Sequence, residues 1–408
     1  MEPLEATRLP WAQGVGRSNR PAPTKSFCRF TRLVRFAQRR YPLARLALIS
    51  APKFYRRHFG RWYPALKRTL AGAGRRRQEA DALSFVRRVV SQVTNIFAPA
   101  ATPAHAIFHL SLLVLGITSC IFLVVSGLLL YALIRFRNRA SATSDPQEPA
   151  QIYGSNQIEL SWTVIPVLIV VMLFLATARI IFSTENAPKP SDALDITVIG
   201  HQFWWEYRYP KLGVVTANEL HIPTGDAAHP IPSYLTMSSA DTDHSFWVPR
   251  LAGKMDLIPN KINTMWIDPL EPGLFLGQCG QYCGTQHAKM LIRVYADRPA
   301  QFAAWVAHQL QPAAQDPAAA EGQAVFLRNA CISCHTVAGT TAAGRFGPDL
   351  THVGGRDTIA SGSVPNTAAN LRAFVDNPAH FKPGALMPEM HLNAHDLDAV
   401  AAYLTTLK

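Results

Sequence analysis

Two long apolar stretches stand out in a chain of 408 residues. Residues 110–134 run for 25 positions without a charged side chain, and residues 160–178 run for 19. At about 1.5 Å per residue these stretches would form helices of about 37 and 28 Å, close to the about 30 Å hydrocarbon core of a bilayer. Two buried core helices are the alternative, but neither stretch has a polar face. We therefore predict two membrane spans, at about 108–135 and 159–181, within a hairpin that occupies residues 101–182.

Positive charge follows the first span directly, at Arg135, Arg137 and Arg139. Short loops rich in Lys and Arg stay on the cytoplasmic side of a membrane. The loop between the spans is therefore predicted to be cytoplasmic, and residues from 183 onward lie in the periplasm or its equivalent. We expect a multi-pass protein of the inner (plasma) membrane of a bacterium.

The net charge of +13 belongs to the beginning of the chain. Residues 1–100 hold 21 Lys and Arg against four Asp and Glu, whereas residues 101–408 hold 19 against 23. No basic motif with interleaved aromatic residues follows, so we predict no nucleic-acid binding. The first 100 residues show no sustained periodicity, and we expect a disordered or non-native extension. A mis-assigned start codon explains it best, with a cleaved leader or a disordered arm as alternatives.

Residues 190–298 contain short β segments broken by Pro and Gly, such as Leu194–Ile199, Ser233–Met237 and Leu291–Tyr295. Such a pattern predicts a small all-β barrel or sandwich. Residues 299–320 read as a helix followed by a linker rich in Pro, Ala and Gln, and a further domain is predicted over 321–408.

Sulfur and imidazole donors cluster near the end of the β region, at Cys279, Cys283, His287 and Met290. His244 supplies a distant second imidazole. Soft sulfur ligands combined with imidazole favour copper or zinc. A disulfide between the two cysteines and a tetrahedral structural zinc site remain alternatives, although neither needs a thioether.

The C-terminal domain contains Cys331-Ile-Ser-Cys334-His335, the signature of c-type haem attachment. A redox disulfide or half a zinc site is the alternative for the two cysteines. A second axial ligand is expected downstream at Met387, with Met390 as its rival, whereas His352, His391 and His395 are expected at the surface. Residues 320–407 resemble class I c-type cytochromes, which implies axial ligation by His335 and Met387. The helix over 395–407 is predicted to begin with a capping box at Asn393 and Asp396 and to pack near Phe326.

The pattern Cys-x-x-x-Cys-x-x-x-His-x-x-Met, together with Gly-His-Gln-Phe-Trp-Trp-Glu-Tyr at 200–207 and Glu159-Leu-Ser-Trp-Thr, resembles subunit II of cytochrome c oxidase. The resemblance covers about residues 96–298. It implies a cupredoxin fold that carries a binuclear copper A centre, held by His244, Cys279, the backbone carbonyl of Gln281, Cys283, His287 and Met290.

Two positions depart from this family. Gln281 replaces a Glu whose side chain helps to hold a magnesium ion at the interface with the catalytic subunit, so the resemblance leaves open whether magnesium accompanies the copper. Phe203 replaces a Trp linked to electron uptake from soluble cytochrome c. Phe203, Trp204 and Trp205 are candidates for electron transfer, or else a packed strand. Glu159 matches a Glu near a proton path, or else caps the second span.

The resemblance implies a subunit of a haem–copper oxidase in which electrons pass from an external donor, such as a c-type cytochrome, through haem c and copper to another chain. That chain, subunit I, would reduce dioxygen to water and pump protons, with subunit III as a further partner. The first rival is a nitric oxide reductase with the same electron path. The second is a non-enzymatic, membrane-anchored copper-binding protein.

Overall fold

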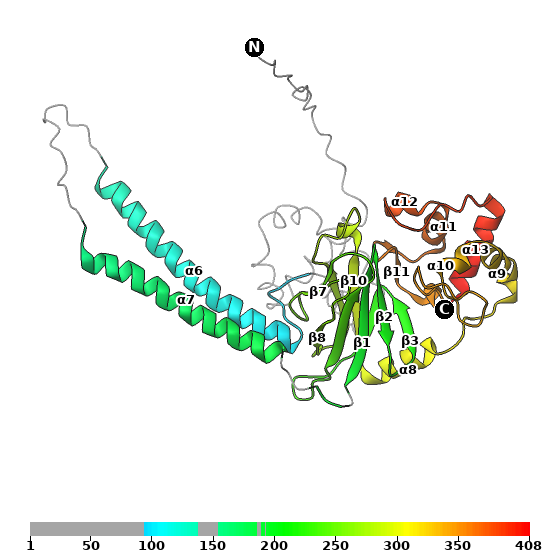
Figure 1. Cartoon of the computed structure of the whole chain (residues 1–408), viewed down its shortest axis with the longest axis horizontal. Coiled ribbons are helices and arrows are strands. Elements are labelled where there is room, and N and C mark those ends of the chain that lie inside the picture. Colours follow the sequence, from blue (N-terminus) through cyan, green and yellow to red (C-terminus); the bar gives the residue numbers. More distant parts are fainter. Residues whose placement is uncertain (1–93, 138–153, 186–188, 192) are drawn as a thin grey trace, which may run out of the picture. The chain divides into compact units, whose positions relative to one another are not determined.

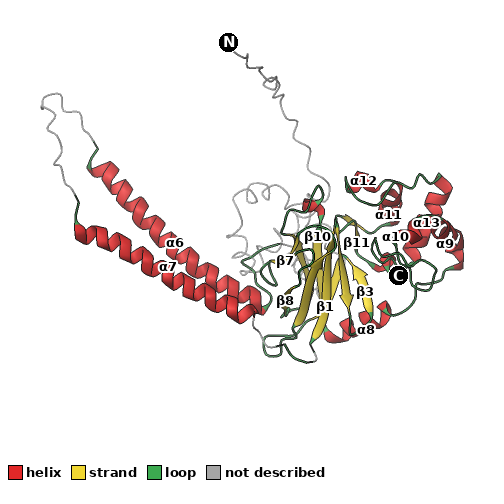
Figure 2. Ribbon diagram, viewed as in Figure 1, coloured by secondary structure: helices red, strands yellow, loops and turns green. Residues whose placement is uncertain are grey.

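A computed structural model describes residues 94–137, 154–185, 189–191 and 193–408. Most of the predicted N-terminal extension, and Arg139 of the predicted cytoplasmic loop, therefore lie outside the described residues. Figures 1 and 2 show three kinds of structure in the described part: a pair of long helices, a β domain and a small helical domain.

The two apolar stretches form the helices α6 (Thr102–Arg135) and α7 (Asn156–Glu185), which run side by side (Figure 1). Both are long and apolar enough to cross a membrane, and none of their most apolar residues is buried within the chain. Because such a surface is unfavourable in water, the exposed side chains are suited to lipid. Both helices are longer than the predicted spans. The first turn of α6 is tied to the β domain, where the Thr102 backbone amide donates to Asp268 at 2.8 Å.

The β domain is a sandwich of two five-stranded sheets, shown in yellow in Figure 2. The first sheet has the order β3-β2-β1-β5-β8 and the second the order β4-β10-β9-β6-β7. Their bounds are β1 Leu194–His201, β2 Trp204–Tyr209, β3 Val214–Ala217, β4 Glu219–Pro223, β5 Ser233–Ser239, β6 His244–Trp247, β7 Met255–Leu257, β8 Asn263–Ile267, β9 Gly273–Cys279 and β10 Leu291–Asp297. β1 pairs parallel to β5, and β4 parallel to β10. The three β segments named from the sequence thus form β1, β5 and β10.

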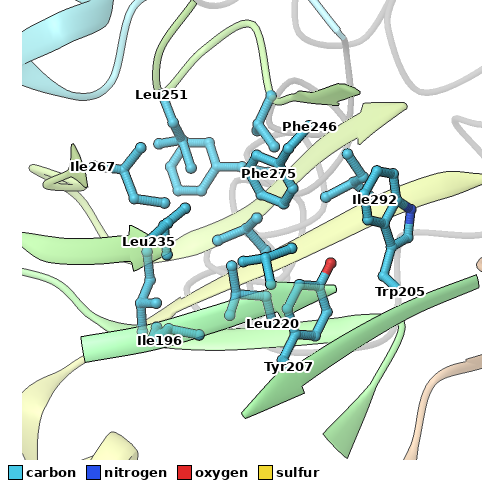
Figure 3. Packing of buried hydrophobic residues seen from close by; sticks show 14 of the residues in the cluster. Ile196, Trp205, Tyr207, Leu220, Leu235, Phe246, Leu251, Ile267, Phe275 and Ile292 are labelled. Atoms are coloured by element: carbon cyan, nitrogen blue, oxygen red, sulfur yellow. The ribbon is translucent and has the colours of Figure 1, made fainter. Parts of the chain in front are cut away.

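Alternate residues of these strands fill the space between the sheets. In β5 every second residue is buried, and β10 shows the same alternation. Figure 3 shows the resulting core, in which Trp205 and Tyr207 of β2 face Phe246, Phe275 and Ile292 of the other sheet. A core of large side chains between two sheets gives a firm frame for the loop that follows β9.

Replacing Leu235 with Ala tests this core. Leu235 is 1% exposed and lies among the residues of Figure 3. Because the substitution leaves a cavity, we expect the free energy of unfolding of the β domain to fall by about 2–5 kcal/mol. Denaturant unfolding followed by tryptophan fluorescence measures this. Val215→Ala, at an exposed position of β3, is the control and should change stability by less than about 0.5 kcal/mol. Equal effects of the two substitutions would contradict the described packing.

The helical domain follows α8 (Pro299–Gln309) and consists mainly of α9 (Ala320–Arg328), α10 (Cys331–Cys334), α11 (Ala368–Asp376), α12 (Pro378–Phe381) and α13 (Ala394–Thr406). Short 3-10 turns η2 (His287–Lys289), η3 (Pro317–Ala319) and η4 (Val353–Gly355) and a two-stranded sheet of β11 (Thr358–Ile359) and β12 (Val364–Pro365) complete the described elements of the chain.

Helices α9 and α13 cross closely, because Gly322 lies against the Ala399 carbonyl, where a Cβ atom would come within 2.0 Å. Phe326 and Tyr403 meet at this crossing, as predicted for Phe326, with ring centroids 5.8 Å apart. Asn393 caps α13 by accepting from the Asp396 amide at 2.9 Å, which is one of the two bonds of the predicted capping box.

The expectation of a surface position for His352 was wrong. Its side chain is buried, at 6% exposure, and its two ring nitrogens lie 3.1 Å from the Lys408 carbonyl oxygen and 3.2 Å from that of Gln311. These carbonyls come from distant parts of the chain, and the contacts that bury His352 are therefore not visible in the local sequence. His391 and His395 are exposed, as expected.

Candidate copper and haem sites

The predicted sulfur ligands meet in one buried cluster at the end of β9. Cys279 is the last residue of β9, and the loop that follows brings Cys283 back so that the two sulfurs lie 3.9 Å apart. They are not bonded to each other. The Met290 sulfur lies 3.9 Å from the Cys283 sulfur, and the Gln281 carbonyl oxygen lies 3.1 Å from the Cys279 sulfur. We call residues 279–290 the copper loop.

Two imidazoles complete the cluster, one beside each cysteine. His244 Nδ1, on β6, lies 3.9 Å from the Cys279 sulfur, and His287 Nδ1 lies 3.8 Å from the Cys283 sulfur. Pairing of Phe246 with Cys279 places β6 beside β9, which is how His244 reaches the loop across 35 residues of sequence. All six predicted copper ligands are thus brought together, and they include two sulfur–imidazole pairs.

The pKa values of the two thiols bear on how they would bind a metal ion. A hydrogen bond from Cys283 holds the pKa of Cys279 well below that of a free thiol, and the same pairing raises the pKa of Cys283. One sulfur is therefore available as a thiolate, and metal binding would have to release a proton from the other. This buried set of soft donors fits copper.

Asp241 was not singled out from the sequence. Its Oδ1 lies 2.9 Å from His244 Nε2, so the carboxylate leaves Nδ1 directed at Cys279. Burial lowers the pKa of His244, but the bonds to Asp241 and Cys279 outweigh burial and raise the pKa above its usual value. A carboxylate behind a metal-binding histidine fixes the ring and increases its basicity. The only local signal was an acidic residue three positions before the histidine.

Replacing Asp241 with Asn is expected to weaken copper binding by about 10- to 100-fold, the usual cost of losing such a support. Titration of the copper-depleted chain with copper, followed by the visible absorbance of the thiolate–copper centre, measures the affinity. Asp243→Asn is a matched control, because Asp243 is exposed and lies one residue from His244. Unchanged affinity in Asp241→Asn would show that the carboxylate does not orient the histidine.

The helical domain encloses the second predicted site, a largely apolar cavity of about 280 Å³. Cys331 and Cys334 of α10 line it together with His335. His335 Nδ1 lies 2.8 Å from the Pro348 carbonyl, so this nitrogen carries the proton and Nε2 is left with a free lone pair. Burial lowers the pKa of His335, which favours the neutral ring. Gly347 lies against the ring, where a Cβ atom would come within 2.6 Å of Cε1. These features fit a covalently attached haem with His335 on the iron.

Both candidate methionines, Met387 and Met390, line the same cavity as His335. Met387 remains the predicted ligand on the strength of its place in Lys-Pro-Gly-Ala-Leu-Met-Pro.

The aromatic residues at 203–205 connect the two sites. Phe203 and Trp204 line the haem cavity, and the Phe203 ring lies against Gly284 of the copper loop. Trp205 points into the sandwich, with its ring 6.0 Å from that of His244. The alternation of a β-strand therefore puts one indole toward each site. The residues thus form a packed strand, and electron transfer through them stays a prediction.

Two further residues between the copper loop and the haem cavity were not predicted from the sequence. Gln202 lines the cavity while its Nε2 donates to the Cys283 carbonyl at 2.6 Å. Lys382 is 4% exposed, lines the cavity and donates through Nζ to the Phe203 carbonyl. Burial lowers the pKa of Lys382 to about 7. Glu159, in contrast, is an exposed residue in the first turn of α7 and is not brought to either site.

Three family models match parts of this chain. Residues 90–180 match the family described as Cytochrome C oxidase subunit II, transmembrane domain, and residues 227–296 match the periplasmic domain of the same subunit. Residues 319–408 match the Cytochrome c family. Cytochrome c oxidase subunit 2 of Alkalihalophilus pseudofirmus is 33% identical over 76% of this chain and 90% of that protein. The chain belongs to the cytochrome c oxidase subunit 2 family.

A second relative and one solved structure are also similar to parts of this chain. Cytochrome c oxidase subunit 2 of Bacillus sp. strain PS3 is 32% identical over 64% of this chain and 77% of that protein. A crystal structure of the periplasmic domain of subunit II of cytochrome oxidase from Bradyrhizobium japonicum is 28% identical, covers 30% of this chain and 95% of that chain, and gives a TM-score of 0.28. The chain is a membrane-anchored bacterial subunit of a haem–copper oxidase, with a fused cytochrome c domain that implies haem and a β domain that implies copper.

Proposed function

We propose that this chain accepts electrons from an external c-type cytochrome and delivers them to the haem–copper catalytic subunit. The haem would be held by Cys331, Cys334, His335 and Met387. The copper pair would be held by His244, Cys279, Gln281, Cys283, His287 and Met290. When bound, the haem and the copper pair supply one-electron redox chemistry.

The observation that carries this proposal is the shared wall between the two sites. Gln202 borders the haem cavity and is hydrogen-bonded to the backbone of Cys283. A direct bond between the wall of one site and a ligand of the other suits a fixed internal route. Trp205, beside His244, offers a second connection through the strand.

Phe203 lies where soluble cytochrome c would dock in the family pattern. Here it is 7% exposed, and its carbonyl accepts bonds from Ser361 Oγ at 2.6 Å and from Lys382. The fused domain therefore covers this position, and we place the contact with the external donor on the cytochrome domain instead. Phe346 and Leu386, both exposed and both lining the haem cavity, mark that face.

The remaining assignments follow from the family and the topology. We propose the bacterial inner membrane, with both redox domains on the periplasmic side, and subunit III as a further partner. Glu159 stays a candidate for the proton path. Whether a magnesium ion binds at the subunit interface stays open, because Gln281 lacks the carboxylate.

Purification in mild detergent tests the proposal. We expect two copper ions and one covalent haem per chain, a co-purifying catalytic subunit with many spans, and oxygen uptake driven by reduced cytochrome c. Consumption of nitric oxide without oxygen uptake would favour the reductase instead. A mononuclear copper signal with no catalytic partner would overturn both.

A further inference from the structure

The segment that presents the candidate methionines to the haem cavity has few ties of its own. Among the residues that the structure describes, 386–392 take part in no hydrogen bond. Downstream the segment is fixed by Asn393, the cap of α13. Upstream it continues from residues 381–384, which begin at the last residue of the short helix α12. The position of Met387 therefore depends on how these two ends are held.

The upstream end is held by the copper loop. Gln286 Nε2 donates to the Pro383 carbonyl at 2.8 Å, and Thr285 Oγ1 donates to the same oxygen at 3.2 Å. Lys289 Nζ donates to the Phe381 carbonyl at 2.9 Å. Three side chains of the copper loop thus donate to two backbone carbonyls of the helical domain, those of Phe381 and Pro383.

The contact between the copper loop and residues 381–384 is close enough to restrict which residue fits at position 384. Gly384 has a φ of +82°, and a Cβ atom there would lie 2.6 Å from Thr285 Oγ1. Gln286 is 5% exposed, and its Oε1 accepts no bond. Its buried amide is therefore used for a single purpose, to donate to Pro383. Because a buried donor is costly to leave unpaired, this bond resists separation of the loop from residues 381–384.

We propose that Gln286 and Lys289 are positioning residues for the haem. They anchor residues 381–384, and this anchor in turn holds the segment that bears Met387. This inference rests on the proposed haem ligation. Groups that support a ligand from behind set how firmly it is held. Freeing the anchor lets residues 386–392 move away from the cavity, and the thioether then binds iron less firmly. Met ligation raises the haem potential, so weaker ligation lowers it.

The test is the double variant Gln286→Glu with Lys289→Met, studied in the complete detergent-solubilised complex. Gln286→Glu preserves the side-chain shape but sets a carboxylate oxygen against the Pro383 carbonyl, and Lys289→Met removes the donor to the Phe381 carbonyl; of the three donors only the Thr285 hydroxyl is left. We expect loss of most of the far-red charge-transfer band of Met-ligated ferric haem and a fall in the haem midpoint potential. Copper content and copper absorbance, measured in the same sample, should stay as in the unaltered chain, which shows that both domains are folded.

Two controls isolate the positioning effect. Gln278→Glu makes the same change at an exposed position of β9 and should leave the band and the potential unchanged. Lys289→Arg, paired with the native Gln286 and Thr285, keeps all three donors and should keep the band. A double variant with full band intensity and unchanged potential overturns the inference. Met387→Leu separates this result from the ligand assignment, since a band that survives Met387→Leu overturns the proposed haem ligation itself.

Discussion

Replacing Cys279 with Ser in the full chain is expected to abolish oxygen uptake by the complex while leaving the covalent haem in place. The serine variant lacks one of the two sulfurs that lie 3.9 Å apart. The missing sulfur is the soft donor that lies beside both His244 and the Gln281 carbonyl. A hydroxyl is a poor ligand for copper where thiolate is required. Copper analysis and an oxygen electrode with reduced cytochrome c measure the two consequences.

Cys120→Ser is the matched control for this substitution, because Cys120 is an exposed thiol within α6. It should leave copper content and turnover as they are. Full turnover in Cys279→Ser, with copper absent, would show that electrons reach the catalytic subunit by another route.

Replacing both Cys331 and Cys334 with Ala is expected to remove the covalent haem and to stop turnover with an external cytochrome as donor. These thiols line the cavity at α10, and thioether bonds to them are the means of attachment in c-type cytochromes. Haem-dependent peroxidase staining after denaturing electrophoresis detects the attached group. The copper absorbance should persist, because the copper ligands all lie in the β domain and its loop.

The outcome separates two ways in which the donor could act. If the haem-free variant still consumes oxygen at the full rate with reduced cytochrome c, the donor reaches the copper domain directly. Because Ser361 and Lys382 cover Phe203, we expect that the donor cannot react directly with the copper domain, and that the haem-free variant takes up no oxygen.

Local pattern was sufficient for much of this molecule. The membrane helices follow from uncharged length, and β1, β5 and β10 follow from short β segments bounded by turns. Ligands close together in sequence, such as Cys279 and Cys283, could be predicted from spacing. His244 could be named from the sequence only as a distant second imidazole, because its approach to the cysteines depends on the pairing of β6 with β9.

Contacts between domains could not be predicted in this way. Glu219, in β4, is 4% exposed and accepts from the backbone amide and the hydroxyl of Thr358 at 3.0 and 2.8 Å, across 139 residues of sequence. A Glu in a strand gives no sign that its partners are amides of another domain. The burial of His352 and the role of Asp241 were missed for the same reason, since each depends on geometry that only the folded chain creates.

The Glu219 contact bears on how the protein would respond to its surroundings. Mobile ions weaken attractions between partners that must find each other through water, over a Debye length of about 8 Å at physiological ionic strength. A carboxylate already enclosed between two covalently joined domains is sheltered from such ions. Raising the salt concentration should therefore slow the arrival of a soluble cytochrome but leave the step inside the chain at its original speed.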